Sequence, residues 1–404
     1  MKLNVFGLLA TTVLAVFCLI GSAAQTLAQN AYIANELSDN VTVIDTRTNT
    51  VVGSPITVGD SPWGVAVAPD GAEVYVTNIN SGSVSVIDTR TNTAVATFPA
   101  GPNPHGVAVS PDGARLYVAN DNFAASTITV IDAETGTTVA AIATGNGNST
   151  AGVTVSPDGQ KVYAVNLSTG EDAVSVIDAA TNAVVATIST PGKWNAYQAA
   201  FSPDGTRAYL SETQVSSNTA PVLTVIDVAT STVVDTIVLG SAFNLVDAAD
   251  GVVVSPDGKR VYVVNDLFSS GQSFFSSQVS AIDTATDGIV AAIPINAGAS
   301  AGISIAPDGR ELYVVNTDAN SVTVVDTRTN ATTAVIPVGR FPISAGNFIQ
   351  PTPRFAGTPG KANCYGQSVS ALARQYGGLN SAARALGFSD VNALQKAILA
   401  FCGE

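Results

Sequence analysis

Residues 64–78 read GVAVAPDGAEVYVTN, and this stretch decides the fold. Two runs of small, β-branched or aromatic residues flank the triplet Pro69-Asp70-Gly71. Proline fixes φ, aspartate bonds to nearby backbone and glycine accepts positive φ, so the triplet predicts a tight turn between antiparallel strands. Residues 83–88 (SVSVID) and 93–98 (TAVATF) have the same strand-forming composition and predict two more strands. Residues 64–98 therefore predict one four-stranded antiparallel sheet.

The same unit recurs along the chain. The Pro-Asp-Gly triplet returns at positions 111, 157, 203, 256 and 307. The second element, usually Tyr-Val-x-Asn, begins at Tyr32, Tyr75, Tyr117, Tyr163, Tyr209, Tyr262 and Tyr313. The third ends at Asp45, Asp88, Asp132, Asp178, Asp227, Asp283 and Asp326. Residues 31–350 thus divide into seven units of roughly 46 residues, the size of a β-propeller blade.

The two ends of this array predict how the ring closes. The first unit begins at Tyr32 and lacks its leading strand. The last unit is followed by residues 344–348 (SAGNF), which stand where a leading strand would come but lack Pro-Asp-Gly. We therefore expect an all-β, seven-bladed propeller with 3+1 closure of the terminal blade, which removes the open edges of the ring. A small α-helical C-terminal module follows it.

The repeats carry a family resemblance. The Tyr-Val-x-Asn and Pro-Asp-Gly motifs resemble those of the YVTN-repeat seven-bladed β-propellers, which include lactonase-like and surface-layer-type proteins. The resemblance covers residues 31–350, about four fifths of the chain. It implies a secreted or surface propeller; some relatives are lactonases and some exported relatives bind DNA. Neither activity comes with a motif that maps onto this sequence.

The N-terminal segment predicts export. Lys2 is followed by an uncharged apolar stretch, residues 5–20, and then by small residues, the pattern of a secretory signal peptide. We expect residues 1–28 to be this signal, cleaved after Ala24 or Ala28, and the protein to reside in the periplasm, outside the cell or at the cell surface. An uncleaved anchor is the alternative; a lipid anchor at Cys18 is disfavoured because bulky Phe17 precedes it.

The C-terminal segment has a different character from the propeller, which we place at residues 29–350. Residues 351–361 are rich in proline and glycine and predict a linker. Residues 362–404 predict a helical module, with helices at 368–376, 382–386 and 391–401. Cys364 and Cys402 are the two cysteines left after signal cleavage, and an exported chain favours a disulfide between them; two free thiols are the alternative.

The distribution of charge disfavours nucleic acid as a partner. The chain has a formal charge of −14, whereas its last 54 residues, with five basic and two acidic side chains, carry +3. The propeller is therefore more acidic than the whole chain and repels phosphate backbones. One apolar run at the N-terminus predicts no transmembrane span after cleavage.

Loop lengths point to a binding face. The connections through Pro-Asp-Gly and through Asp-x-x-Thr keep nearly constant lengths, whereas those at the other end of the blades vary, as around residues 212–222, 241–244 and 265–279. Variation on one end of a repeat scaffold marks a binding face; neutral drift of surface loops is the alternative. The position before each leading strand holds Trp63, His105, Ala151, Tyr197, Asp250, Ala301 and Ile343. The candidate binding residues are Trp63, His105, Lys193, Trp194, Tyr197, Asp250, Arg340 and Phe341.

Catalytic motifs are weak. A single histidine, His105, is too few for a multi-histidine metal site, and no Gly-x-Ser-x-Gly elbow occurs. We therefore expect a non-enzymatic binding or scaffold propeller without a cofactor, which holds a small molecule, a glycan or a protein on its variable face. The alternative is a lactonase-like hydrolase or lyase at the channel mouth, assisted by calcium held by Asp250 and Asp247.

Overall fold

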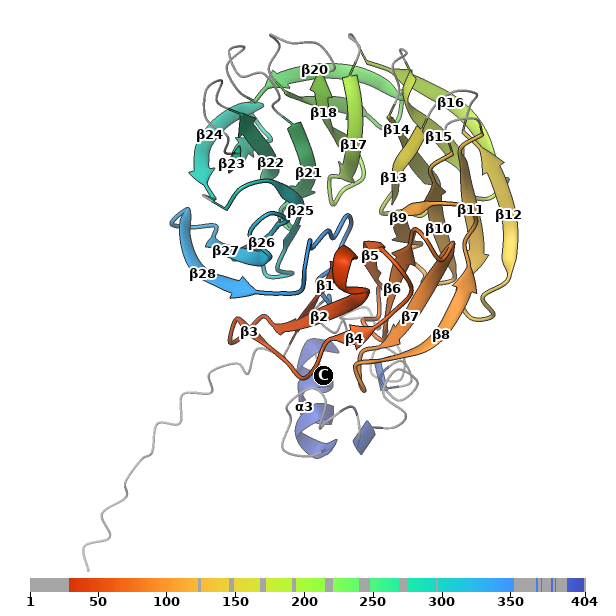
Figure 1. Ribbon diagram of the computed structural model, residues 1–404, viewed down its shortest axis with the longest axis vertical. Helices are drawn as coiled ribbons and strands as arrows, with labels where there is room; N and C mark the ends of the chain where they lie inside the picture. Colours follow the sequence, from red (N-terminus) through yellow and green to blue (C-terminus); the bar gives the residue numbers. More distant parts are fainter. Residues whose placement is uncertain are drawn as a thin grey trace, which may run out of the picture.

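The computed structural model describes residues 29–351 apart from 123–124, 145–148, 168–171, 191–193, 215–220, 240–247, 269–274 and 296. In the C-terminal segment it describes residues 368–369, 372, 379–380, 382 and 391–402. Within these residues the strands form seven four-stranded antiparallel units arranged in a ring, which confirms the predicted seven-bladed propeller (Figure 1). The leading strands β5, β9, β13, β17, β21 and β25 surround the centre and the fourth strands lie outside.

The strands follow the sequence repeats blade by blade. Blade 1 contains β1 (Asn30–Asn35), the 3-10 turn η1 (Glu36–Ser38), β2 (Asn40–Asp45), β3 (Thr50–Val51) and β4 (Ile56–Thr57). Blade 2 contains β5 (Pro62–Val67), β6 (Glu73–Asn78), β7 (Ser83–Asp88) and β8 (Thr93–Pro99), and blade 3 contains β9 (Pro104–Val109), β10 (Arg115–Asn120), β11 (Thr127–Asp132) and β12 (Thr138–Ala143).

The remaining blades have the same order. Blade 4 contains β13 (Ser149–Val155), β14 (Lys161–Leu167), β15 (Asp172–Asp178) and β16 (Ala183–Ser189); blade 5 contains β17 (Trp194–Phe201), β18 (Arg207–Gln214), β19 (Val222–Asp227) and β20 (Thr232–Val238). Blade 6 contains β21 (Ala248–Val254), β22 (Arg260–Phe268), β23 (Phe275–Asp283) and β24 (Gly288–Pro294), and blade 7 contains β25 (Ser300–Ile305), β26 (Glu311–Asn316), β27 (Ser321–Asp326) and β28 (Ala331–Pro337).

The C-terminal part of the propeller completes blade 1. Ala31 pairs with Ile349 and Asn35 pairs with Pro342, both antiparallel, so residues 342–349 take the place of a leading strand beside β1. The Tyr32 N–H donates to the Phe348 carbonyl at 2.9 Å and the Ile343 N–H donates to the Ala34 carbonyl at 2.9 Å. Three strands from one end of the propeller and one from the other therefore form blade 1, as predicted.

The core lies between neighbouring blades. The second strands are buried along both faces, and their motif tyrosines, such as Tyr32 and Tyr313, are fully buried. Two of the tyrosine hydroxyls reach the next blade: Tyr32 Oη donates to Asn92 Oδ1 at 2.8 Å and Tyr313 Oη donates to Asn49 Oδ1 at 2.6 Å. Each buried side chain of this size contributes roughly 1.5–3 kcal/mol, so the repeated tyrosine fills the space between two blades and, at these two positions on either side of blade 1, also joins them.

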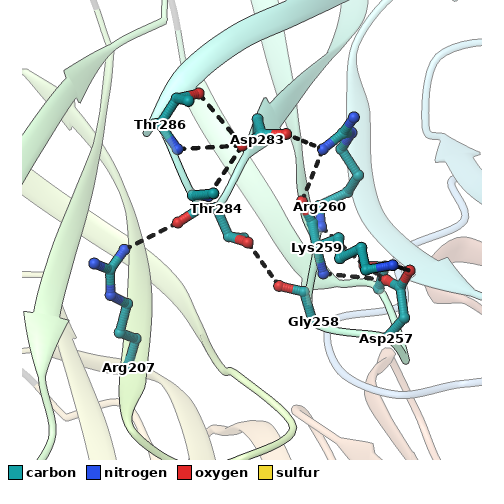
Figure 2. Close-up of polar contacts among 10 residues, drawn as sticks. Arg207, Asp257, Gly258, Lys259, Arg260, Asp283, Thr284 and Thr286 are labelled. Carbon is teal, nitrogen blue, oxygen red and sulfur yellow. Dashed lines mark hydrogen bonds and ion pairs between the residues drawn. The ribbon is translucent and has the colours of Figure 1, made fainter.

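The end of the ring that carries the Pro-Asp-Gly turns, here the turn face, is held by short polar contacts. In blade 6 the Asp257 carboxylate accepts hydrogen bonds from the Ser255 hydroxyl at 2.6 Å and the Lys259 N–H at 3.1 Å. Between blades 5 and 6, Arg207 donates to the Thr284 carbonyl at 3.2 Å, and the Thr284 hydroxyl donates to the Gly258 carbonyl at 2.8 Å (Figure 2). The repeat aspartates therefore act here as turn formers.

The C-terminal segment contains the helix α3 (Val391–Cys402), which confirms the helix predicted over residues 391–401. Leu394 and Ile398, on the predicted apolar stripe, are fully buried. Among the described residues, no helix is long and apolar enough to cross a membrane. The predicted signal peptide and its cleavage sites, most of the linker and Cys364 lie outside the described residues, as does the side chain of Cys402, so the disulfide stays a prediction.

Candidate functional site on the loop face

The end of the ring opposite the Pro-Asp-Gly turns, here the loop face, has a repeated irregularity in its strand pairing. In blade 2 the pairing passes from Pro62↔Asn78 to Val65↔Val76, so the leading strand has one residue more than its partner. The same one-residue excess follows Pro104, Thr150, Ala196, Ala249 and Ser300. These are β-bulges, which turn a residue out of the ladder and are common at barrel rims and beside active sites.

The bulges coincide with the position that the sequence singled out. In each leading strand one residue pairs with the motif asparagine of the second strand, or with Glu212 in blade 5. We call the next residue along the leading strand the rim position. In blades 2 to 7 it is Trp63, His105, Ala151, Tyr197, Asp250 and Ala301. In blade 1 Asn35 pairs with Pro342, which gives Ile343 the same place. Register thus brings all seven residues to one level of the ring.

Trp63 and His105 form a direct contact at this level. Their ring centroids lie 5.1 Å apart at an interplanar angle of 71°, an edge-to-face arrangement, and both side chains are half-buried. His105 Nδ1 lies 3.0 Å from the Asn103 carbonyl; a carbonyl only accepts, so Nδ1 is the donor in this contact, and in the neutral ring Nε2 is then an acceptor. The Thr77 hydroxyl accepts from the Gly64 N–H at 2.8 Å and donates to the His105 carbonyl at 2.5 Å, which fixes the two blades relative to each other.

Arg340 and Phe341 lie where the chain crosses from blade 7 into the closing strand. Both side chains are exposed, and Phe341 has a positive φ of 52°. The Arg340 N–H donates to Ser38 Oγ at 2.9 Å, and the Phe341 N–H donates to Asn320 Oδ1 at 2.7 Å. The two residues therefore lie against the η1 loop of blade 1, on the loop face.

The other predicted candidates are described less fully. Trp194 and Tyr197 lie in β17 and Asp250 lies in β21, which fixes their backbone position on the loop face; their side chains lie outside the described residues. Lys193 and Asp247 also lie outside the described residues. The structure thus brings Trp63 and His105 together, and it places Tyr197 and Asp250 at the same level only through register.

Blades 4, 5 and 6 extend further at the loop face than the others. β10 and β26 end at the motif asparagine, whereas β14 continues to Leu167, β18 to Gln214 and β22 to Phe268. Leu167 pairs with Asn195 of β17, so blades 4 and 5 join into one eight-stranded sheet at this end. The loop face is therefore built unevenly around the ring, as the loop lengths predicted.

A buried carboxylate under this face escaped the sequence prediction. Glu212 occupies the motif-asparagine position of blade 5 and is fully buried, where it accepts hydrogen bonds from the Thr190 hydroxyl at 2.7 Å and from the Thr224 hydroxyl. In blades 1 to 4 and 7 the asparagine amide donates to a hydroxyl at the equivalent place, as from Asn78 to Ser85 at 3.0 Å. Burial raises the pKa of Glu212 from 4.5 to about 7. The sequence did contain a signal of this buried carboxylate: blade 5 has a glutamate where the other blades have the motif asparagine.

We expect Glu212 to make stability depend on pH. Because its folded-state pKa is raised above its ordinary value, the native state binds a proton that the unfolded chain has released between pH 4.5 and about 7. Stability therefore falls as pH rises through this window, by about 3 kcal/mol in total. Glu212→Gln should abolish this loss and be the more stable protein at pH 8, as measured by urea unfolding at pH 4.5, 6 and 8. Equal pH dependence in the two proteins would contradict the assignment.

A cavity of about 700 Å³ lies within the ring, displaced from the rim position toward the turn face. Its lining includes Ala66, Val107, Val153 and Ile303 on the leading strands, and five of the six prolines that begin the Pro-Asp-Gly turns: Pro69, Pro111, Pro157, Pro256 and Pro307. Among the rim-position residues with described side chains, such as Trp63 and His105, none lines it. In the described part of the chain, no group of three or more His, Cys, Asp or Glu side chains is arranged to hold a metal ion.

Comparisons with known proteins agree with this architecture. Residues 25–144 match the family model described as "Lactonase, 7-bladed beta-propeller". The chain is thus similar to the lactonase-like seven-bladed propellers, the resemblance that the repeats predicted. No curated protein matches the chain.

Two solved structures show the fold alone. Hydrazine synthase of Kuenenia stuttgartiensis has 24% sequence identity and a TM-score of 0.64, with 72% of this chain and 90% of that chain covered. A functionally unknown protein from Desulfotomaculum acetoxidans has 13% identity and a TM-score of 0.63, with 79% of this chain and 100% of that chain covered.

Proposed function

We propose that the protein is an exported, non-enzymatic binding or scaffold propeller that holds a ligand or partner on its loop face. The observation that carries this proposal is the edge-to-face pair of Trp63 and His105 at the bulged rim. Two half-buried aromatic rings fixed by backbone contacts offer a rigid surface with one polar acceptor, the combination by which small-molecule and glycan sites orient a ligand.

The form of the two faces supports the loop face as the functional one. On the turn face the aspartates are engaged in turns and ion pairs, such as Asp326 with Arg328 at 2.7 Å and Asp88 with Arg90 at 3.4 Å. On the loop face the strands of blades 4 to 6 are lengthened, and each leading strand carries a bulge. Export, as proposed from residues 1–28, would expose this face to extracellular or periplasmic molecules.

We expect the double variant Trp63→Ala/His105→Ala to lose binding. The mature protein, applied to a glycan array and to a pull-down from periplasmic and cell-surface extracts, should capture a defined ligand. The double variant should bind it at least about ten-fold more weakly, equivalent to about 1.4 kcal/mol. The matched control, Val95→Ala/Val185→Ala, changes two exposed side chains of the outer strands and should bind normally. Equal capture by both variants would refute a site at Trp63 and His105.

Lactone hydrolysis at the same rim is the second candidate function. The family-model match covers the stretch that contains Trp63 and His105, and Nε2 of the neutral His105 ring, which has no hydrogen-bond partner among the described residues, is suited to accept a proton from water. Hydrolysis of a lactone panel, with added calcium and with chelator, separates this candidate from simple binding. Turnover that disappears in His105→Ala would favour it, and no turnover in either condition would remove it.

A further inference from the structure

The described lining of the cavity inside the ring carries no charge. Its walls are formed by leading-strand residues and turn prolines, and no lysine, arginine, histidine, aspartate or glutamate is among the described residues that line it. At about 700 Å³ the cavity lies within the range of small-molecule sites, roughly 300–1,000 Å³.

The lining combines apolar surface with a few polar side chains. Val107, Val153 and Ile303 present apolar surface, and the polar side chains are Thr154, Gln198, Ser304 and Asn347. Gln198 stands in blade 5 where the neighbouring leading strands have a glycine, and its Oε1 accepts from the Val252 N–H at 3.3 Å. Its Nε2 donates no hydrogen bond within the described residues, so it is available to an acceptor on a ligand.

A polar pair lies elsewhere on the lining, at blade 7 and the closing strand. The Ser304 hydroxyl donates to Asn347 Oδ1 at 3.2 Å, and Ser304 is almost fully buried whereas Asn347 is exposed. The pair joins blade 7 to the closing strand. Hydrogen-bonding side chains therefore lie at separate points of a mostly apolar wall, an arrangement that orients a ligand with acceptors as well as apolar faces.

The surroundings of the cavity select against charge. Pro111, Pro157 and Pro256 line it, and each is followed by an exposed aspartate of its turn. The carboxylates of Asp112, Asp158 and Asp257 accept hydrogen bonds from a serine hydroxyl and from backbone, which lowers their pKa and keeps them ionised. An anion meets this acidic border, and a cation that passes it finds no counter-charge among the lining residues.

We propose that this cavity is a second binding site, distinct from the loop-face rim, and that it takes one neutral small molecule with apolar faces and hydrogen-bond acceptors. The ligand enters from the turn face. Its apolar faces pack on the leading strands, and its acceptors bind the Gln198 amide or a hydroxyl of the lining. The site does not depend on Trp63 or His105, because neither residue lines the cavity.

Two dyes, one neutral and one anionic, test the site in the mature protein. Nile red is neutral and has acceptors, whereas 1-anilinonaphthalene-8-sulfonate is an anion. Fluorescence titration should show saturable binding of one Nile red per chain, and at least about ten-fold weaker binding of the anionic dye. Absence of saturable Nile red binding, or equal binding of the two dyes, would overturn the proposal.

Variants locate the bound dye. Ala108→Phe places a large side chain on a lining residue and should weaken Nile red binding at least about ten-fold, whereas Gln198→Leu keeps the size but removes the amide and should weaken it several-fold. Trp63→Ala should bind Nile red normally even where it loses the loop-face ligand, which separates the two proposals. Circular dichroism checks folding, and if Ala108→Phe does not fold, Gln198→Leu decides. Unchanged binding in the folded variants would refute the site.

Discussion

A chain that ends after Phe341 should not form a stable propeller. It lacks residues 342–349, so β1 loses its inner partner and the ring has two open edges. The deletion also removes three buried side chains, Ile343, Phe348 and Ile349. The loss of one such side chain costs roughly 2–5 kcal/mol. Three such losses together are comparable to the whole free energy of unfolding of a typical protein, about 5–15 kcal/mol.

A second truncation provides the matched control for this prediction. A chain that ends after Pro351 keeps the pairing of the closing strand with β1 and lacks only residues 352–404. Thermal unfolding followed by circular dichroism should show a cooperative transition for this longer chain and none, or one lowered by more than about 15 °C, for the shorter chain. If the two chains unfold at the same midpoint, the 3+1 closure does not stabilise the ring. Phe348→Ala in the full chain should cost about 3–5 kcal/mol.

The blades could be predicted from the sequence because their hydrogen bonds are local. Pro-Asp-Gly and Asp-x-x-Thr each determine a turn through contacts within a few residues, as between Asp257 and Ser255. Seven copies of one pattern then require a shared geometry, and the missing strand at one end and the extra strand at the other indicate closure. The helix Val391–Cys402 was likewise predicted, over residues 391–401, from its apolar period.

The details of the site could not be predicted in the same way. That Trp63 and His105 occupy equivalent positions is visible in the repeat, but their ring contact depends on the bulges and on the angle between blades 2 and 3. The burial of Glu212 depends on how blade 5 packs against Thr190 at the end of β16. The cavity depends on the radius of the whole ring, which no single repeat determines.

The closing strand shows one further limit of repeat-based prediction. The segment from Pro342 to Ile349 spans the same length of β1 as Pro62 to Val67 spans of β6, although it contains two more residues. The added residues lie near Gly346, which has φ of 119°. The repeat predicted the place of this strand but not its distortion, because here the chain must join two ends of a ring rather than continue it.

Gly302→Ala should be among the most damaging substitutions that add one methyl group to the propeller. Gly302 has φ of 137°, a conformation that alanine rarely adopts, and a Cβ there would lie well under 3.0 Å from the Ser344 carbonyl oxygen. That oxygen belongs to the closing strand. It cannot easily move away, because the N–H of the same residue, Ser344, donates to the Ala301 carbonyl at 3.2 Å and holds the closing strand against β25. Backbone strain of about 1–3 kcal/mol and overpacking of about 1–3 kcal/mol add to roughly 4 kcal/mol.

Two further alanine variants separate the two causes. Gly113 has φ of 75° with nothing within 4 Å of an added Cβ, so Gly113→Ala should show the backbone strain alone, about 1–2 kcal/mol. At Gly64 φ is not positive, but an added Cβ would meet the His105 carbonyl oxygen, so Gly64→Ala should show the clash alone. Urea unfolding of the three variants should rank Gly302→Ala as the least stable. A Gly302→Ala protein no less stable than Gly113→Ala would mean that the closing strand can move away from β25, and that the ring is held less tightly at its closure than its hydrogen bonds indicate.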